Sequence, residues 1–147
     1  MKHLVEVYNS NPRFIATHLG RHKVRCQWLM DEIYSMNQAG FWSCKIINKA
    51  SHHIIGLLEF KMGIESYLSL LMMHHNHAHQ GLGQQIYQGM EDYVISHGTR
   101  SIRIDVVKGY DDGVTNFWLR NGFHVAYDIS LTWENMSLPA VVMKKSV

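Results

Sequence analysis

The chain has 147 residues, 46% hydrophobic and 18% charged, which suits one domain and is too little for two. Its net charge of +2, from 14 basic and 12 acidic residues, lacks the strong positive field of a nucleic-acid-binding protein. No apolar run approaches the ~18 residues that span a bilayer. We therefore expect a single domain over residues 1–147, with neither a nucleic acid nor a membrane as its partner.

The cysteine content points to a reducing compartment. Cys26 and Cys44 are too few for a disulfide-stapled fold and have no CxxC spacing. The opening MKHLVEVYNS has no long apolar stretch of the kind found in signal peptides. We expect a cytoplasmic protein, and the sequence leaves a homodimer open.

The N-terminal quarter predicts one strand and two helices. A short strand is expected at Leu4–Tyr8. Asn11 followed by Pro12 is typical of an N-cap with proline at the first helical position, and the helix that it opens should stop near Gly20. A second helix is expected over Val24–Ala39, where apolar residues recur at helical spacing.

Three strands should follow. Phe41–Ile47, Ile54–Phe60 and Tyr67–Met73 are rich in β-branched, aromatic or leucine residues and are separated by polar or glycine-containing turns. Runs of this kind, in succession, predict three antiparallel strands.

The second half returns to helical periodicity. A helix is expected over Leu82–His97, and Gly98 would stop it. Its apolar face would contain Leu82, Ile86, Met90, Tyr93 and Val94. A half-buried strand at Ser101–Val107, a short helix at Asp112–Arg120 and strands at Val125–Thr132 and Ala140–Lys144 complete the chain. This order predicts an α/β (α+β) domain with a mixed, mostly antiparallel central sheet and helices on both faces.

A glycine-rich segment joins the third of these strands to the long helix. Gln80-Gly81-Leu82-Gly83-Gln84 stands where strand gives way to helix. Glycine lets a ligand approach the backbone N–H groups closely, and the start of a helix carries partial positive charge, so the pattern favours a phosphate site. A tight turn alone would also need glycines, so the pattern by itself leaves both interpretations open.

Familiar nucleotide and hydrolase motifs are absent. The dinucleotide fingerprint GxGxxG would need glycine where Ile86 stands, and no GK[ST] sequence completes a P-loop. Neither GxSxG nor HExxH occurs, so hydrolase and metalloprotease functions have no support from a motif.

Two segments carry a resemblance to a known family. Gln80-Gly81-Leu82-Gly83 is similar to the second half of a [QR]xxGx[GA] pyrophosphate loop, and about 35 residues later Asn116–Phe123 (NFWLRNGF) is similar to a short helix that ends in an aromatic pair and KxGF. Together they resemble the GNAT superfamily of acyl-CoA-dependent N-acetyltransferases. The tail Ala140–Lys145 is similar to the closing strand of that family, and the resemblance is weakest before Phe41.

The resemblance implies acetyl-CoA as co-substrate, bound where the strands Tyr67–Met73 and Ser101–Val107 separate. The pantetheine arm would pair with the backbone of Leu71, Met72 and Met73. The pyrophosphate would lie on the backbone amides of the loop, namely His79, Gln80, Gly81, Leu82, Gly83 and Gln84. Asp111 would take the place of a cofactor-contacting asparagine, and Trp118 that of an aromatic residue beside the thioester.

The implied reaction is transfer of an acetyl group to a primary amine of a small molecule or peptide, by direct attack in a ternary complex. Trp118 replaces the tyrosine that commonly protonates the departing thiolate, and an indole N–H is no acid at neutral pH. Tyr110 and Tyr127 are weak substitutes. Ala78 and His79 also depart from the loop pattern, where glutamine or arginine and glycine are expected.

The attacking amine must first lose a proton, because alkyl ammonium groups have a pKa of about 10.4. Glu59, at the end of the strand Ile54–Phe60, is the first candidate base, although a solvent-facing carboxylate would have the same sequence signature. His74 and His75 are its rivals, because imidazole titrates near neutrality.

Two other functions stay open. One is a non-catalytic CoA-binding sensor, which the missing tyrosine favours. The other is a metal-binding protein, because four of the 11 histidines lie within His74–His79. Zinc sites in proteins usually combine such histidines with cysteine or carboxylate ligands, which this cluster lacks, so we expect no metal.

Overall fold

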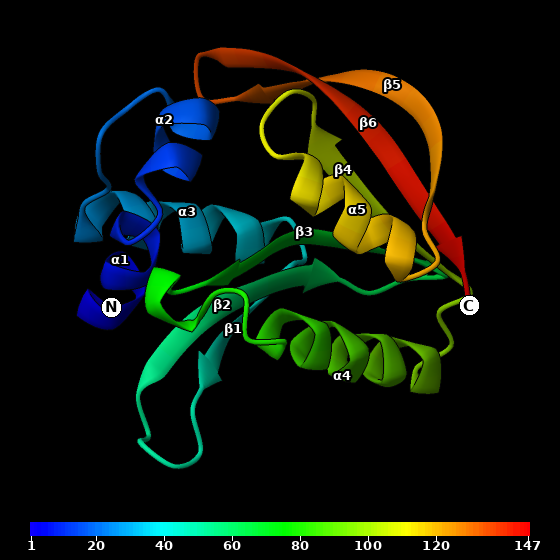
Figure 1. Cartoon of the computed structure of the whole chain (residues 1–147), viewed down its shortest axis with the longest axis horizontal. Coiled ribbons are helices and arrows are strands. Elements are labelled where there is room, and N and C mark those ends of the chain that lie inside the picture. The colour runs from blue at the N-terminus through cyan, green and yellow to red at the C-terminus, as the bar shows by residue number, and fades with distance from the viewer.

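A computed structural model describes all 147 residues and contains five α-helices around one six-stranded sheet (Figure 1). The helices are α1 (Lys2–Asn9), α2 (Pro12–Leu19), α3 (Cys26–Gln38), α4 (Leu82–Ser96) and α5 (Asp112–Arg120), with a short 3-10 helix η1 (His75–His77). The strands are β1 (Trp42–Ile47), β2 (Ile54–Lys61), β3 (Glu65–Met73), β4 (Ser101–Val107), β5 (His124–Trp133) and β6 (Met136–Ser146). None of the helices has both the length and the apolar character that crossing a bilayer requires.

The strand order is β1-β2-β3-β4-β6-β5. Neighbouring strands are antiparallel throughout except β3 and β4, which run parallel because α4 connects them as a crossover. The expected mixed, mostly antiparallel sheet is therefore confirmed.

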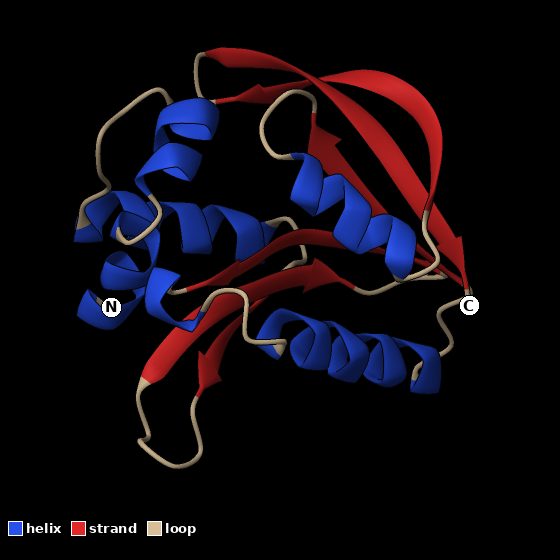
Figure 2. Ribbon diagram, viewed as in Figure 1, coloured by secondary structure: helices blue, strands red, loops and turns tan.

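Helices cover both faces of this sheet, as expected (Figure 2). On one face, α1, α2 and α3 pack over a cluster that includes Tyr8, Ile15, Leu29 and Leu57. On the other, α4 and α5 pack over a larger cluster whose members include Tyr87 and Trp118. The sheet is thus the middle layer of three.

The first element differs from its expectation, because Leu4–Tyr8 is part of helix α1 and not a strand. Leu4, Val7 and Tyr8 are almost fully buried, and their spacing of three and four places them on one helical face. An eight-residue helix contains only about two turns, so its sequence pattern is hard to distinguish from that of a short apolar strand.

The other elements lie within a few residues of their expected ends. In α3 the fully buried residue is Leu29, whereas Trp28, Ile33 and Met36 are half-buried. In α4, Leu82, Ile86, Met90 and Val94 of the expected apolar face pack on the core. Tyr87 is completely buried there, and Tyr93 is 46% exposed.

The most consequential feature of the sheet is the separation of β3 from β4. The two strands pair over four residues, from Glu65 opposite Ser101 to Leu68 opposite Ile104, and then part. Figure 1 shows them leaving one corner, near the C-terminus, and diverging. Beyond Leu68, β3 keeps its pairing with β2 but has no strand on its other side.

A β-bulge marks the point of separation. Leu68 pairs with Phe60 and Leu70 pairs with Glu59, so Ser69 is an extra residue in β3. The insertion reverses the alternation of side chains. Leu68 faces the α4 layer, whereas Leu70 and Met72 face α1 to α3.

A buried ion pair ties α4 to the last strand. Glu91 of α4 is 8% exposed, and both of its carboxylate oxygens accept hydrogen bonds from Lys145 Nζ, at 3.1 and 2.9 Å. The adjacent Lys144 makes a comparable 2.9 Å contact with Glu65, but with both partners more exposed. The two pairs differ mainly in burial.

We expect Lys145→Met to lower the free energy of unfolding by about 2 kcal/mol, because it leaves the buried Glu91 charge unpaired. Lys144→Met, the matched control, should lower it by less than about 1 kcal/mol. Urea unfolding of both variants measures the difference. Adding Glu91→Gln to Lys145→Met should recover much of the loss, and equal losses in the two single variants would contradict this account.

Candidate functional site

The free side of β3 presents unpaired backbone groups. The N–H of His74 donates to the Ile55 carbonyl at 2.7 Å, so the backbone of His74 faces β2. In an antiparallel ladder this direction alternates, so Met72 also faces β2, opposite Leu57, while Leu71 and Met73 face away from it. We call this side of residues 69–73 the open edge.

Of the three residues proposed for the pantetheine arm, two turn their backbone toward the open edge. These are Leu71 and Met73, whose side chains pack beneath the α4 layer. Met72 is buried in the opposite core cluster with Leu57 and Leu70.

The start of α4 lies just after the open edge in the chain. Gly81 is its N-cap, with φ of +77°, a backbone conformation that glycine adopts without strain. No side chain caps the first turn. The exposed N–H groups of this turn therefore need an external acceptor, and the helix dipole favours an anion.

Gly81 and Gly83 also leave space at this turn. A Cβ atom added at either position would meet nothing within 4 Å. Packing would therefore allow a larger residue at Gly83, and glycine inside a helix lowers stability by about 0.5–1 kcal/mol relative to alanine. Neither packing nor helix stability explains this glycine. The loop thus fits a phosphate group that approaches the backbone closely.

His79 adopts φ of +59°, in the left-handed region. It stands where the resembling family often has glycine, so the sequence departs from the pattern while the backbone keeps the glycine-like conformation. Its side chain is exposed, as is that of Gln80, whose amide donates to the Asn76 carbonyl at 3.2 Å.

Two side-chain amides join α4 to α5 at the same end of the site. Gln84 Nε2 donates to Asn121 Oδ1 at 2.7 Å, and Asn121 Nδ2 donates back to Gln84 Oε1 at 2.9 Å. This reciprocal pair fixes the first turn of α4 against the end of α5.

Asp111 and Trp118 occupy different environments. Asp111 is exposed and caps α5, because its carboxylate accepts the Gly113 N–H at 2.8 Å. It also lines a polar cleft of about 460 Å³ with Arg13 and Tyr110. Trp118 is 8% exposed and packs edge-on against Tyr87.

Glu59 is not solvent-facing. Its side chain is 4% exposed, on the face of the sheet that α1 to α3 cover, and Ser43 Oγ donates to its Oε2 at 2.8 Å. Burial raises the pKa of the Glu59 carboxyl above its ordinary value; the hydrogen bond from Ser43 lowers it, and the nearby Glu32 raises it further. Glu59 pairs with Leu70, next to the start of the open edge.

The rival histidines have structural contacts. His74 Nδ1 accepts the Asn76 N–H at 3.1 Å, and the exposed His75 donates its backbone N–H to Ser10 Oγ at 3.0 Å. Across the 147 residues, no three His, Cys, Asp or Glu side chains converge to hold a metal ion.

Tyr110 and Tyr127 lie in different segments of the fold. Tyr110 follows β4, where its ring packs edge-on against Phe14 and His18, and burial raises its pKa. Tyr127 is 48% exposed on the edge strand β5.

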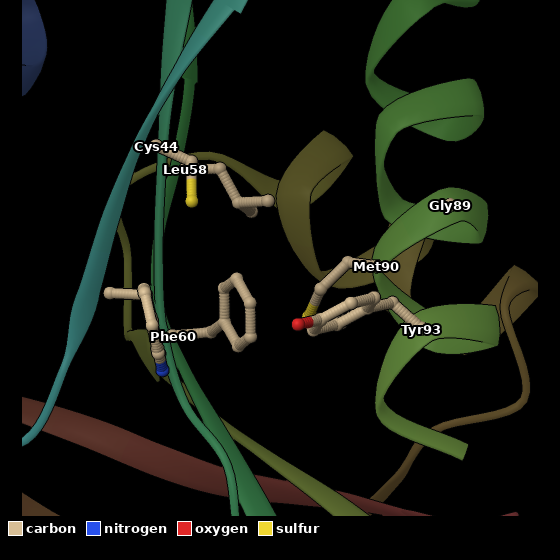
Figure 3. A pocket seen from close by; sticks show the side chains of 7 residues that line it. Cys44, Leu58, Phe60, Gly89, Met90 and Tyr93 are labelled. Atoms are coloured by element: carbon tan, nitrogen blue, oxygen red, sulfur yellow. The ribbon is translucent and has the colours of Figure 1, made fainter. Parts of the chain in front are cut away.

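A second hollow lies away from the open edge, between α4 and the strands β1 and β2 (Figure 3). This apolar crevice has a volume of about 290 Å³ and is lined by Trp42, Cys44, Leu58, Phe60, Gly89, Met90 and Tyr93. Burial, and then the charge of Glu59, raises the pKa of the Cys44 thiol. The crevice contains none of the residues proposed above for cofactor or catalysis.

Asn11 has a contact that its sequence position does not indicate. It is the N-cap residue of α2, but its side chain makes no capping hydrogen bond. Instead, Asn11 Nδ2 donates to the Val7 carbonyl and to the Met73 carbonyl, both at 3.0 Å. Because Asn11 and Met73 are 62 residues apart in the chain, no local pattern could reveal this contact.

The sequence matches the model of the acetyltransferase (GNAT) family over residues 3–123. No match is found among curated proteins. Solved structures share the fold at low identity. The PaiA N-acetyltransferase from Thermoplasma acidophilum, in complex with coenzyme A, has a TM-score of 0.68 and 18% identity, covering 99% of this chain and 92% of that one.

Two further structures give the same result. An acetyltransferase from Thermus thermophilus has a TM-score of 0.74 and 17% identity, covering 96% of this chain and 86% of that one. The ribosomal-protein-S18-alanine N-acetyltransferase from Escherichia coli has a TM-score of 0.65 and 13% identity, with coverage of 79% and 75%.

We expect His79→Gly to raise the free energy of unfolding by about 0.5 kcal/mol, because it relieves the left-handed strain of a non-glycine residue. His77→Gly, within η1, lacks this relief and should lower it by a similar amount. Chemical denaturation of both variants provides the measurement. A lower stability for His79→Gly would show that the side chain of His79 outweighs its backbone strain.

Proposed function

Because the chain belongs to the acetyltransferase (GNAT) family, whose members transfer acyl groups from CoA, we propose that it is an acetyl-CoA-dependent N-acetyltransferase. The acceptor is a primary amine of a small molecule or peptide, which attacks the thioester directly in a ternary complex. The observation that carries the proposal is the open edge of β3, which leads directly into the uncapped first turn of α4. We further propose that residues 1–147 act as one cytoplasmic domain, which is compatible with two free cysteines.

Acetyl-CoA is the acyl donor in this proposal. Its pyrophosphate would be held by the backbone N–H groups from His79 to Gln84, where the two glycines leave space. Its pantetheine arm would extend the sheet along the open edge, on the outward groups of Leu71 and Met73. Asp111 and Trp118 would contact the arm from α5.

Two groups of the chain, the Glu59 carboxylate and the Met73 N–H, would take part in the chemical step. Glu59 removes a proton from the acceptor ammonium, and its raised pKa brings it closer to the value that suits a base near neutral pH. The amine nitrogen forms a bond to the thioester carbon while the N–H of Met73 stabilises the oxyanion. The carbon–sulfur bond breaks and CoA leaves as a thiolate. The second proton of the attacking nitrogen passes through water to this thiolate, whose thiol form has a pKa of about 8.5, and leaves the neutral amide.

Trp118 favours a second candidate, a CoA-binding module without catalysis. It stands in place of the expected acid and is buried against Tyr87, and its indole N–H cannot protonate a thiolate at neutral pH. A thiol-release assay with acetyl-CoA and a panel of polyamines, amino acids, aminoglycosides and peptides separates the candidates. Thiol release supports the enzyme. Thermal stabilisation by acetyl-CoA without thiol release supports the sensor, and no stabilisation at 100 times a micromolar Kd, where about 2.7 kcal/mol is expected, overturns both.

We expect Gly83→Glu to weaken CoA binding at least tenfold, because it places bulk and negative charge at the proposed pyrophosphate site. Gly89→Glu is the matched control. It lies further along α4, its Cβ also meets nothing within 4 Å, and its affinity should stay within about twofold of wild type. Titration calorimetry with CoA measures both. Equal affinities in the two variants would move the pyrophosphate away from this turn.

We expect Glu59→Gln to lower kcat by about 10²–10⁴-fold and to remove the acidic limb of the pH profile. In wild type that limb should lie above the ordinary carboxyl range, because the folded pKa of Glu59 is raised. A raised carboxyl pKa disfavours folding as pH rises through it. Glu59→Gln should therefore be at least as stable as wild type at pH 8, and the difference should disappear below pH 4.

Glu6→Gln, at an exposed carboxylate of α1, is the control for this variant and should change neither property. An unchanged kcat and acidic limb in Glu59→Gln would exclude Glu59 as the base and leave His74 and His75 to be tested.

A further inference from the structure

The junction between α1 and α2 is bonded to the end of β3. Asn11 Nδ2 reaches the Met73 carbonyl at 3.0 Å. The neighbouring Ser10 Oγ accepts the backbone N–H of His75 at 3.0 Å and donates to the Val7 carbonyl at 2.7 Å. Two successive side chains thus hold the backbone on either side of His74.

The bond to Met73 lies on the open edge. The His74 N–H donates to Ile55 of β2, and the Met73 carbonyl belongs to the same peptide group, so it points the opposite way. No strand pairs with it there. The amide of Asn11 takes the place of the missing strand at this one acceptor.

Fixing this carbonyl also fixes the N–H of the same residue. In an extended strand the N–H and C=O of one residue point to the same side, so the Met73 N–H also faces the open edge. The residues on either side of Met73, Met72 and His74, face β2, and the Met73 carbonyl is bonded to Asn11 on the other side, so the peptide groups of Met73 are not free to rotate. Its N–H direction is therefore set before any ligand arrives.

We propose that Asn11 is a positioning residue for acetyl transfer, whose side-chain amide fixes the Met73 backbone so that the Met73 N–H meets the thioester oxygen. This inference rests on the proposed function. Asn11 acts through Met73 and touches neither the acyl group nor the amine. Because Nδ2 already occupies the Met73 carbonyl, that carbonyl does not pair with the pantetheine arm, and the Met73 N–H is left for the thioester oxygen.

The fold offers a matched control at the same corner. Asn9 also joins two segments through its side chain, since its Nδ2 donates to the Val24 carbonyl at 3.1 Å and its Oδ1 accepts the Val24 N–H at 2.8 Å. It makes no bond to β3. Asn9→Ala therefore measures what loosening the N-terminal helices does by itself.

Asn11→Asp removes the bond to Met73 while it keeps the shape of the side chain. Helix α2 loses no capping bond, because the Asn11 side chain makes none, but the carboxylate can donate to neither the Met73 nor the Val7 carbonyl. We expect kcat to fall about tenfold or more, since loss of a whole oxyanion donor lowers kcat by about 10²–10³-fold. The KM for acetyl-CoA and the Kd for CoA should stay within about twofold of wild type.

The carbonyl stretch of bound [1-¹³C]acetyl-CoA, measured by difference infrared spectroscopy, reports the hydrogen bond directly. In wild type it should lie below its value in water-free reference solvent, and in Asn11→Asp and Asn11→Ala it should move back toward that value. Asn9→Ala should keep the wild-type stretch and kcat. If the Asn11 variants match Asn9→Ala in both properties, Asn11 is structural and the inference is overturned.

The infrared measurement also separates this inference from the proposed function. It needs bound acetyl-CoA but no acceptor. If the carbonyl stretch is shifted in wild type and returns in the Asn11 variants, but no acetyl group reaches any amine, the transferase is overturned while the effect of Asn11 on the bound thioester stands. Absence of acetyl-CoA binding to wild type would overturn both.

Discussion

The structure depends on a strand edge that is left without a partner inside the sheet. Backbone N–H and C=O groups in a folded protein must be bonded, and an unpaired edge is ordinarily covered or shortened. Here β3 keeps β2 on one side for its whole length and loses β4 after Leu68. The bulge at Ser69 and the α1–α2 junction meet this edge, and the backbone of Leu71 and the Met73 N–H are left there without a strand partner.

Most of the architecture could be predicted from the sequence because its periods are clear. The strict alternation of Ser101–Val107 and the turn residues Asn121 and Gly122 defined β4 and the end of α5, and both are confirmed. The family was also recognisable from the glycines of one loop and the end of one short helix, and it is confirmed. Helix α1 was predicted as a strand. Its eight residues contain too few helical turns for the helical period to be distinguished from a short apolar strand.

The site was harder to predict from the sequence, because much of it consists of backbone groups. The pairing with β2 and the bulge decide which peptide groups of Leu71, Met72 and Met73 point outward. Both are properties of the whole sheet. Glu59 could be named as a carboxylate at a strand end, but its burial comes from helices that precede it by more than 20 residues. A buried carboxylate with a raised pKa destabilises a fold at neutral pH, which is a common compromise at sites of proton transfer.

The bulge at Ser69 also limits how this segment of the chain can change length. Because Leu68 already pairs with Phe60 and Leu70 with the adjacent Glu59, deleting Ser69 would remove the bulge and leave Leu70 and the residues after it on their present faces. The pairing of these residues with β2, and with it the direction of their peptide groups, would also stay the same. The spare residue of this segment is thus Ser69, whereas a residue added after Leu70 would reverse the faces and the peptide directions on one side of the insertion.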